Sequence, residues 1–323
     1  LFQGKAVKEI KQILAAQLGV PRFRQRFLSE DGGSRIEDHD VIAPEAVKIQ
    51  LVLLEFSPPD ALEEQKMIAA ARDNNSNVLE ELLRKPRSPN RKDAAGKTPL
   101  HHAARNGHVE PARLLLEAGA TKDARDEGHG GWTPLFFAAQ NGHIAVVRLL
   151  IEAEVDLNLA DTDGATPLFF AAQIGQVEVL RLLIEAGADS GQAKSTTGET
   201  PLYVAARNAK VEVVRLLLQP GVDIDAALPA TGVTPLYIAC EQGNVEVVRL
   251  LLDARVDVDK ATTATGAAPL YIAAQNGHAD IVSLLIQGGA DRSKDYAGAT
   301  PLDIAAFKRH KDVVALLKHL DTI

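Results

Sequence analysis

Histidine is the residue type in this chain best suited to hold a metal ion or to act as an acid or base near neutral pH. Six of the nine histidines lie between residues 101 and 278: His101, His102, His108, His129, His143 and His278. The chain has no H-E-x-x-H motif, no C-x-x-C pair and no G-x-S-x-G motif. His108, His143 and His278 each follow a glycine and lie at least 35 residues apart, so we do not expect them to converge on one ion. We therefore expect no enzyme activity, no metal and no cofactor.

The carboxylates also have a simple explanation. Four glutamates each stand three residues before an arginine: Glu110–Arg113, Glu178–Arg181, Glu212–Arg215 and Glu246–Arg249. This is the spacing of ion pairs on a solvated helix face, each worth a few tenths of a kcal/mol. The glycine-rich stretch EGHGGW at 127–132 lacks the Lys followed by Ser or Thr of a phosphate-binding loop. It predicts an insertion in a turn.

Composition limits the classes of partner. The 323 residues carry 35 Lys and Arg against 43 Asp and Glu, a net charge of -8. That charge disfavours nucleic acid and anionic membranes, and no apolar run approaches the roughly 18 residues of a membrane span. Cys240 is the only cysteine, so we expect no intrachain disulfide and an intracellular location, cytoplasmic or nuclear. The chain opens LFQGKAVKEI without an initiator methionine, so we expect the natural N-terminus to lie upstream, and an organellar location stays open.

One phrase organises most of the chain. It reads TPLFFAA at 133 and 166, TPLYVAA at 200, TPLYIAC at 234 and APLYIAA at 268. Its prolines recur every 32 to 35 residues, at Pro99, Pro134, Pro167, Pro201, Pro235, Pro269 and Pro301. About nine residues later comes a second phrase of the type VEVVRLLL. Seven copies at one period predict stacked structural units.

Each unit is predicted to be a pair of helices and a polar turn. Thr98 supplies an N-cap hydroxyl, and Pro99 takes the first helical position, where its missing N–H costs nothing. Paired alanines make a thin face that a neighbouring helix can approach closely. Glycines are expected to end this first helix in the left-handed conformation: Gly107, Gly142, Gly175, Gly243 and Gly277. The second helix carries Leu and Val at i, i+3, i+4 spacing, and buries them only by stacking.

The fourth letter of the phrase falls at helix position N3, where a polar side chain can reach back to the cap. Only His101 and the terminal Asp303 are polar there. The other copies are aromatic: Phe136, Phe169, Tyr203, Tyr237 and Tyr271. We predict that these rings pack between repeats rather than bind a ligand. Ala268 lacks the cap hydroxyl of its equivalents, so Ala268→Thr is predicted to stabilise the array.

These residues resemble the ankyrin repeat, whose signature includes T-P-L-H-x-A-A and G-H-x-x-x-V-x-x-L-L. The resemblance covers residues 93–320, and a degenerate unit, ALEEQKMIAAARDNNSNVLEELLRK at 61–85, precedes it. It implies a mostly α fold, an ankyrin-repeat α-solenoid of about eight repeats: an N-terminal capping repeat at 61–92, then seven repeats at 93–323 with the last as a cap. It also implies inter-repeat hydrogen bonds from His108, His143 and His278.

Residues 1–56 lack the repeat pattern. They read as a helix at 6–18, a strand near 24–29, a turn at Gly32 and Gly33, a loop, and a strand at 47–54. This order resembles a small α+β ubiquitin-like (β-grasp) domain without its first hairpin, joined by a linker at 57–60. An unrelated small α+β cap is the alternative. The resemblance implies a binding patch at Arg26, Leu28 and Val52, whose alternative role is to cover the first repeat.

The predicted binding surface is the concave face of the array, formed by variable residues that follow the alanine pairs. They are Arg105, Asn106, Gln140, Asn141, Gln173, Ile174, Arg207, Asn208, Glu241, Gln242, Gln275 and Asn276, with Phe307 and Lys308 in the last repeat. Trp132, at a turn tip, is either a binding hot spot or a turn-packing residue. Asn158 loosely resembles the ankyrin asparagine that intracellular oxygenases hydroxylate.

The sequence therefore predicts a non-enzymatic scaffold, monomeric on its own, that holds a protein partner on its ankyrin surface. The ubiquitin-like end would cap the array or recruit a second protein. Two alternatives stay open: a regulatory fragment of a larger ubiquitin-pathway enzyme, and a structural accessory subunit of a large multiprotein complex. The identity of the partner does not follow from a repeat fold.

Overall fold

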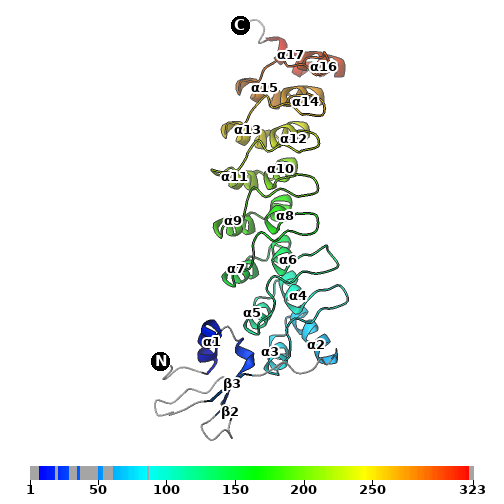
Figure 1. The fold of residues 1–323 in the computed structure, drawn as a ribbon. Coiled ribbons are helices and arrows are strands. Elements are labelled where there is room, and N and C mark those ends of the chain that lie inside the picture. The colour runs from blue at the N-terminus through cyan, green and yellow to red at the C-terminus, as the bar shows by residue number, and fades with distance from the viewer. Residues whose placement is uncertain are drawn as a thin grey trace. The chain divides into compact units, whose positions relative to one another are not determined.

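The computed structural model describes residues 7–18, 21–28, 35–36, 50–53, 61–85 and 87–319. The chain divides into two compact units, Leu1–Asp156 and Leu157–Ile323. The first contains α1 (Val7–Leu18), the 3-10 helix η1 (Arg22–Arg24), β1 (Gln25–Leu28), β2 (Arg35–Ile36), β3 (Gln50–Leu53), α2 (Ala61–Arg72), α3 (Ser76–Arg84), α4 (Pro99–Asn106), α5 (Val109–Glu117), α6 (Pro134–Gln140) and α7 (Ile144–Glu152) (Figure 1). The predicted turn at Gly32 and Gly33 and the predicted linker at 57–60 lie outside the described residues.

The second unit consists of five consecutive helix pairs. They are α8 (Pro167–Ile174) with α9 (Val177–Glu185), α10 (Pro201–Arg207) with α11 (Val211–Leu217), α12 (Pro235–Gln242) with α13 (Val245–Asp253), α14 (Pro269–Asn276) with α15 (Ala279–Gln287), and α16 (Pro301–Lys308) with α17 (Lys311–His319). Within this unit the first helices of successive pairs contact one another, as do the second helices (Figure 1). The described residues thus hold eight helix pairs, three in the first unit and five in the second.

The caps of the first helices form much as the sequence predicts. Thr166, Thr200 and Thr234 each accept a hydrogen bond at 3.1 Å from the backbone N–H three residues later. Gly107, Gly175, Gly243 and Gly277 are left-handed C-caps. The prediction for Gly142 is displaced by one residue: α6 ends at Gln140, Asn141 is the C-cap with φ -87, and Gly142 follows with φ 71.

Packing in both units comes from the small alanine face and the apolar second helix. Ala103, Ala138 and Ala273 have no exposed surface, and neither does Leu251 of α13. Because each first helix presents alanine to its neighbour, the helices can approach closely and bury the leucines and valines between pairs. The predicted Glu–Arg pairs lie on exposed second-helix faces, as at Glu246 and Arg249, 3.5 Å apart.

The N-terminal segment of the first unit has its own small core. Strands pair in the order β2-β1-β3, both pairs antiparallel, with Arg26 opposite Val52. Val7 and Ile10 of α1 pack on Phe27 of β1. The helix and the strands β1 and β3 fall within the predicted ranges, whereas β2 lies in a segment predicted as a loop.

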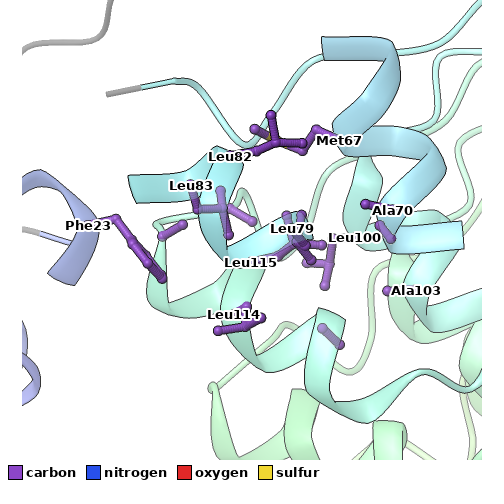
Figure 2. Close-up of a cluster of buried hydrophobic side chains, with 14 of the residues drawn as sticks. Phe23, Met67, Ala70, Leu79, Leu82, Leu83, Leu100, Ala103, Leu114 and Leu115 are labelled. Carbon is purple, nitrogen blue, oxygen red and sulfur yellow. The ribbon is translucent and has the colours of Figure 1, made fainter. Parts of the chain in front are cut away.

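The N-terminal segment also enters the core of the first two helix pairs. Phe23 of η1 belongs to the cluster that contains Leu83 of α3 and Leu114 of α5, and Figure 2 shows its ring pointing toward them. Next to it, the buried Arg22 guanidinium lies 3.0 Å from the Glu117 carboxylate. The contact is therefore both apolar and ionic. It joins residues 22–23 to α3 and α5, the second helices of the first two pairs, which we call the outer helices.

Candidate protein-binding surface

The predicted binding residues occupy the last turn of the first helices, which we call the variable column. In each unit these positions are either exposed or half-buried. Exposed are Arg105, Asn106, Asn141, Ile174, Asn208, Gln242, Asn276, Phe307 and Lys308; half-buried are Gln140, Gln173, Arg207, Glu241 and Gln275. The structure thus places all of them at the surface, in two sets that belong to the two units.

Several asparagines of the variable column have a structural task that the sequence did not predict. The Asn106 side-chain amide donates to the Arg72 carbonyl (3.1 Å), and Asn276 donates to the Glu241 carbonyl (3.0 Å). Asn208 makes a longer bond of the same kind to the Gln173 carbonyl. Each bond ties a first helix to the end of the preceding one. These asparagines are therefore partly committed to packing. The signal available in the sequence was an Asn that recurs at the end of the first helix.

The predicted inter-repeat role of the Gly-His histidines is confirmed. His108 bonds the Arg72 carbonyl at 3.0 Å and His278 the Glu241 carbonyl at 3.3 Å, so Asn and His share one acceptor. His143 bonds the Arg105 carbonyl at 2.9 Å. In the described residues, no three His, Cys, Asp or Glu side chains come together as ligands of a metal ion.

His101 makes the reach-back bond predicted for position N3. The Thr98 backbone N–H donates to Nδ1 of His101 at 3.0 Å. Nδ1 is thereby an acceptor, so Nε2 carries the proton and donates to the Trp132 carbonyl at 3.1 Å. Burial disfavours the charged ring and lowers the pKa of His101 to about 4. Asp303 completes the matching capping box in the last pair.

Trp132 is 9% exposed and packs inside the turn of its own repeat. Its ring stacks on Phe136 at 5.5 Å between centroids and meets Phe137 edge-on at 5.3 Å. The Trp132 backbone N–H donates to the buried Asp126 carboxylate at 2.8 Å, which closes the loop formed by the EGHGGW insertion. The geometry matches the turn-packing alternative, because the ring is covered and not available to a partner.

The aromatic residues at N3 are buried, as predicted for packing between repeats. Phe136, Phe169, Tyr203, Tyr237 and Tyr271 are each exposed by 8% or less. Burial, followed by the Glu241 carboxylate, raises the pKa of Tyr237 to about 12. Burial also raises the pKa of Tyr203.

Asn158 belongs to a ladder of side chains that links successive turns. Each accepts a backbone N–H from the next turn: Asn90 from Thr121, Asp123 from Asp156, Asn158 from Asp189, Asp225 from Asp257 and Asp259 from Asp291. The Asn158 bond measures 2.8 Å. The bond gives Asn158 a packing role, and its hydroxylation stays a prediction.

Large apolar side chains reach solvent at two places in the variable column of the second unit. Phe307 of α16 is 78% exposed and Ile174 of α8 is 42% exposed. Between them in chain order lie Arg207, Glu241 and Gln275, one on each intervening first helix. Exposed apolar groups next to polar ones are typical of surfaces that bind other proteins.

Comparison with known proteins now identifies the repeats. A family model described as ankyrin repeats (3 copies) matches residues 44–126, 66–161, 122–194, 142–227, 190–262 and 254–322. The chain belongs to the ankyrin-repeat family. Repeats of this family are generally protein–protein interaction modules. No helix in the described part of the chain is both long and apolar enough to cross a membrane.

Two relatives illustrate the likeness. Ankyrin repeat domain-containing protein 39 from Homo sapiens is 39% identical over 62 residues, which are 19% of this chain and 34% of that protein, so the match spans about a third of that relative. The crystal structure of the human ASB11 ankyrin repeat domain aligns with a TM-score of 0.59 and 29% identity, covering 69% of this chain and 96% of that one. Neither comparison supports the ubiquitin-like resemblance of residues 1–56, which stays a prediction.

Proposed function

We propose that this chain is a non-enzymatic scaffold that holds a protein partner on the variable column of its second unit. The observation that carries the proposal is the exposure of Phe307 and Ile174, because large apolar side chains in solvent gain free energy when a partner covers them. The surrounding alanines, prolines and rings are buried and belong to the fold. The variable column is thus the part of each first helix left for recognition.

For the N-terminal segment we propose the capping role. Phe23 and Arg22 contact the outer helices α3 and α5, where they cover apolar surface of the first pairs. Arg26 of the predicted ubiquitin-like patch is half-buried. The side chains of Leu28 and Val52 lie outside the described set, so recruitment of a second protein through this patch stays a prediction.

The test is affinity capture from a cell lysate with the full chain, followed by quantitative mass spectrometry. The double variant Ile174→Ala/Phe307→Ala should lose the proteins that the wild-type chain recovers. Ile144→Ala is a matched control, because Ile144 is 40% exposed but lies at the start of a second helix in the first unit. Equal recovery by the wild type and the double variant would refute the proposed surface.

A further inference from the structure

Glu241 is a half-buried carboxylate in the variable column, in the last turn of α12. In the described part of the chain, no lysine, arginine or histidine side chain forms an ion pair with it. The backbone of Glu241 does have partners: its carbonyl accepts hydrogen bonds from Asn276 and His278. The carboxylate of Glu241, in contrast, has no counter-ion among the described residues.

The preceding repeat shows what the same arrangement does when a counter-ion is present. Arg207 occupies the position equivalent to Glu241, lies 5.7 Å over the Tyr203 ring and forms an ion pair with Glu199. Glu199 stands directly before the cap threonine. In the repeat of Glu241, that place is taken by Val233, which has no charge to offer. Among the described residues, Glu241 therefore has no equivalent of the partner that Arg207 has in Glu199.

The residue one helical turn before Glu241 is a tyrosine, as it is at the equivalent place in the repeats on either side. Tyr237 precedes Glu241 by one helical turn, and Tyr271 holds the equivalent place in the next repeat. Tyr296, half-buried in the following turn, meets the Tyr271 ring edge-on at 5.3 Å between centroids. After burial, the Glu241 charge is the next cause that raises the pKa of Tyr237, so the carboxylate lies within electrostatic reach of that hydroxyl.

We propose that Glu241, one helical turn after Tyr237, receives a lysine or arginine side chain of the protein partner. This inference rests on the proposed function and names the chemistry of the partner segment. A cation beside the carboxylate of this half-buried residue gains charge-assisted hydrogen bonds. The arrangement repeats, between two molecules, what Arg207 does within the chain. The net charge of -8 also favours approach of a basic segment.

The experiment selects 12-residue random peptides displayed on phage against the full chain, then measures the dissociation constants of synthetic copies by fluorescence anisotropy. We expect the selected peptides to share a Lys or Arg whose replacement weakens binding. Glu241→Gln should weaken binding by at least about tenfold, because a charge-assisted contact is lost. Glu246→Gln is the matched control, since Glu246 is exposed on α13 and already pairs with Arg249.

Two further variants separate the site from a general effect of charge. Val233→Lys supplies an internal cation next to Glu241, so it should weaken peptide binding as strongly as Glu241→Gln although the carboxylate is intact. Glu241→Lys should abolish binding of the Lys peptide and restore binding of the same peptide with Glu in place of that Lys. Circular dichroism of each variant checks that the repeats are folded.

The outcomes distinguish this inference from the proposed function. Selected peptides without a basic residue, or Glu241→Gln with wild-type affinity, would overturn the inference. If Phe307→Ala weakens the peptides and Glu241→Gln does not, the variable column still binds protein and only the basic contact is wrong. If neither variant weakens them, both proposals are wrong. If no peptide is enriched, the basic contact is wrong, and the capture experiment above decides the proposed function alone.

Discussion

Ala268→Thr should make the second unit more stable. Ala268 is the N-cap of α14, with φ -87 and ψ 163, and it offers no side-chain acceptor to the helix. Thr234 holds the equivalent place in α12 with φ -94 and ψ 167, and its hydroxyl accepts the Tyr237 N–H at 3.1 Å. Because the two backbones match, a threonine at 268 should cap the Tyr271 N–H in the same way.

The expected gain is that of an N-cap hydroxyl, about 0.5–2 kcal/mol in the free energy of unfolding. In the present chain the Tyr271 N–H has the Ala268 carbonyl at 3.0 Å as its backbone acceptor. Space is available, because Thr234 is as deeply buried as Ala268 and its side chain fits the same junction between helix pairs. The gain should therefore lie near the middle of the range.

The assay is urea unfolding of the full chain, with hydrogen exchange of the Tyr271 amide as a local readout. Thr234→Ala should show the reverse change, a loss of about 1 kcal/mol. Thr133→Ala is the matched control with a smaller expected loss, because the buried Thr133 hydroxyl has no hydrogen-bond partner among the described residues. A stability at or below wild type for Ala268→Thr, with Thr234→Ala clearly destabilised, would refute the capping argument at this position.

Three further predictions concern other parts of the fold. Ala209→Gly should raise the unfolding free energy by about 1 kcal/mol in urea, because Ala209 has φ 53 where glycine carries no steric penalty. His101 binds its proton less readily in the folded state, so its contribution to the unfolding free energy, up to about 3 kcal/mol, is present above pH 6.5 and is lost as the pH falls toward about 4. The variant His101→Asn should remove this pH dependence from the urea midpoint. Phe23→Ala should cost the first unit about 3–5 kcal/mol and speed amide exchange in α1 and α5, with exchange in α14 unchanged.

The helix pairs were predictable because their signals are local and repeated. A threonine before a proline, an alanine pair and a glycine define the start, packing face and end of the first helix within one short segment. His108 and its equivalents were also assigned correctly, since the same residue at the same place in several repeats indicates a bond that each repeat makes. Each copy is an independent observation of one physical role.

Long-range packing was harder to predict. Nothing in the residues around Phe23 shows that its ring enters the core of α3 and α5, because the contact depends on how a separate segment meets the repeats. The asparagine bonds were missed for a related reason. Asn106 and Asn276 lie where the sequence varies. Their acceptors are backbone carbonyls of the preceding repeat, and the residue type at a position does not indicate whether its carbonyl accepts such a bond.

The repeats therefore separate structural from recognition residues by internal comparison. Where a position departs from its equivalents and loses a bond, as Ala268 loses the cap, the departure should cost stability, and restoring the common residue should recover it. Other departures leave a charged or large apolar side chain at the surface, as at Glu241 and Phe307. These side chains add nothing to the stability of the fold. Such residues raise the cost of the unbound state, through an uncompensated carboxylate or an exposed ring, and a partner that covers them lowers it. For that reason, replacing Glu241 or Phe307 should impair binding without lowering the unfolding free energy, whereas replacing Ala268 or Ala209 should raise the unfolding free energy and leave binding unchanged.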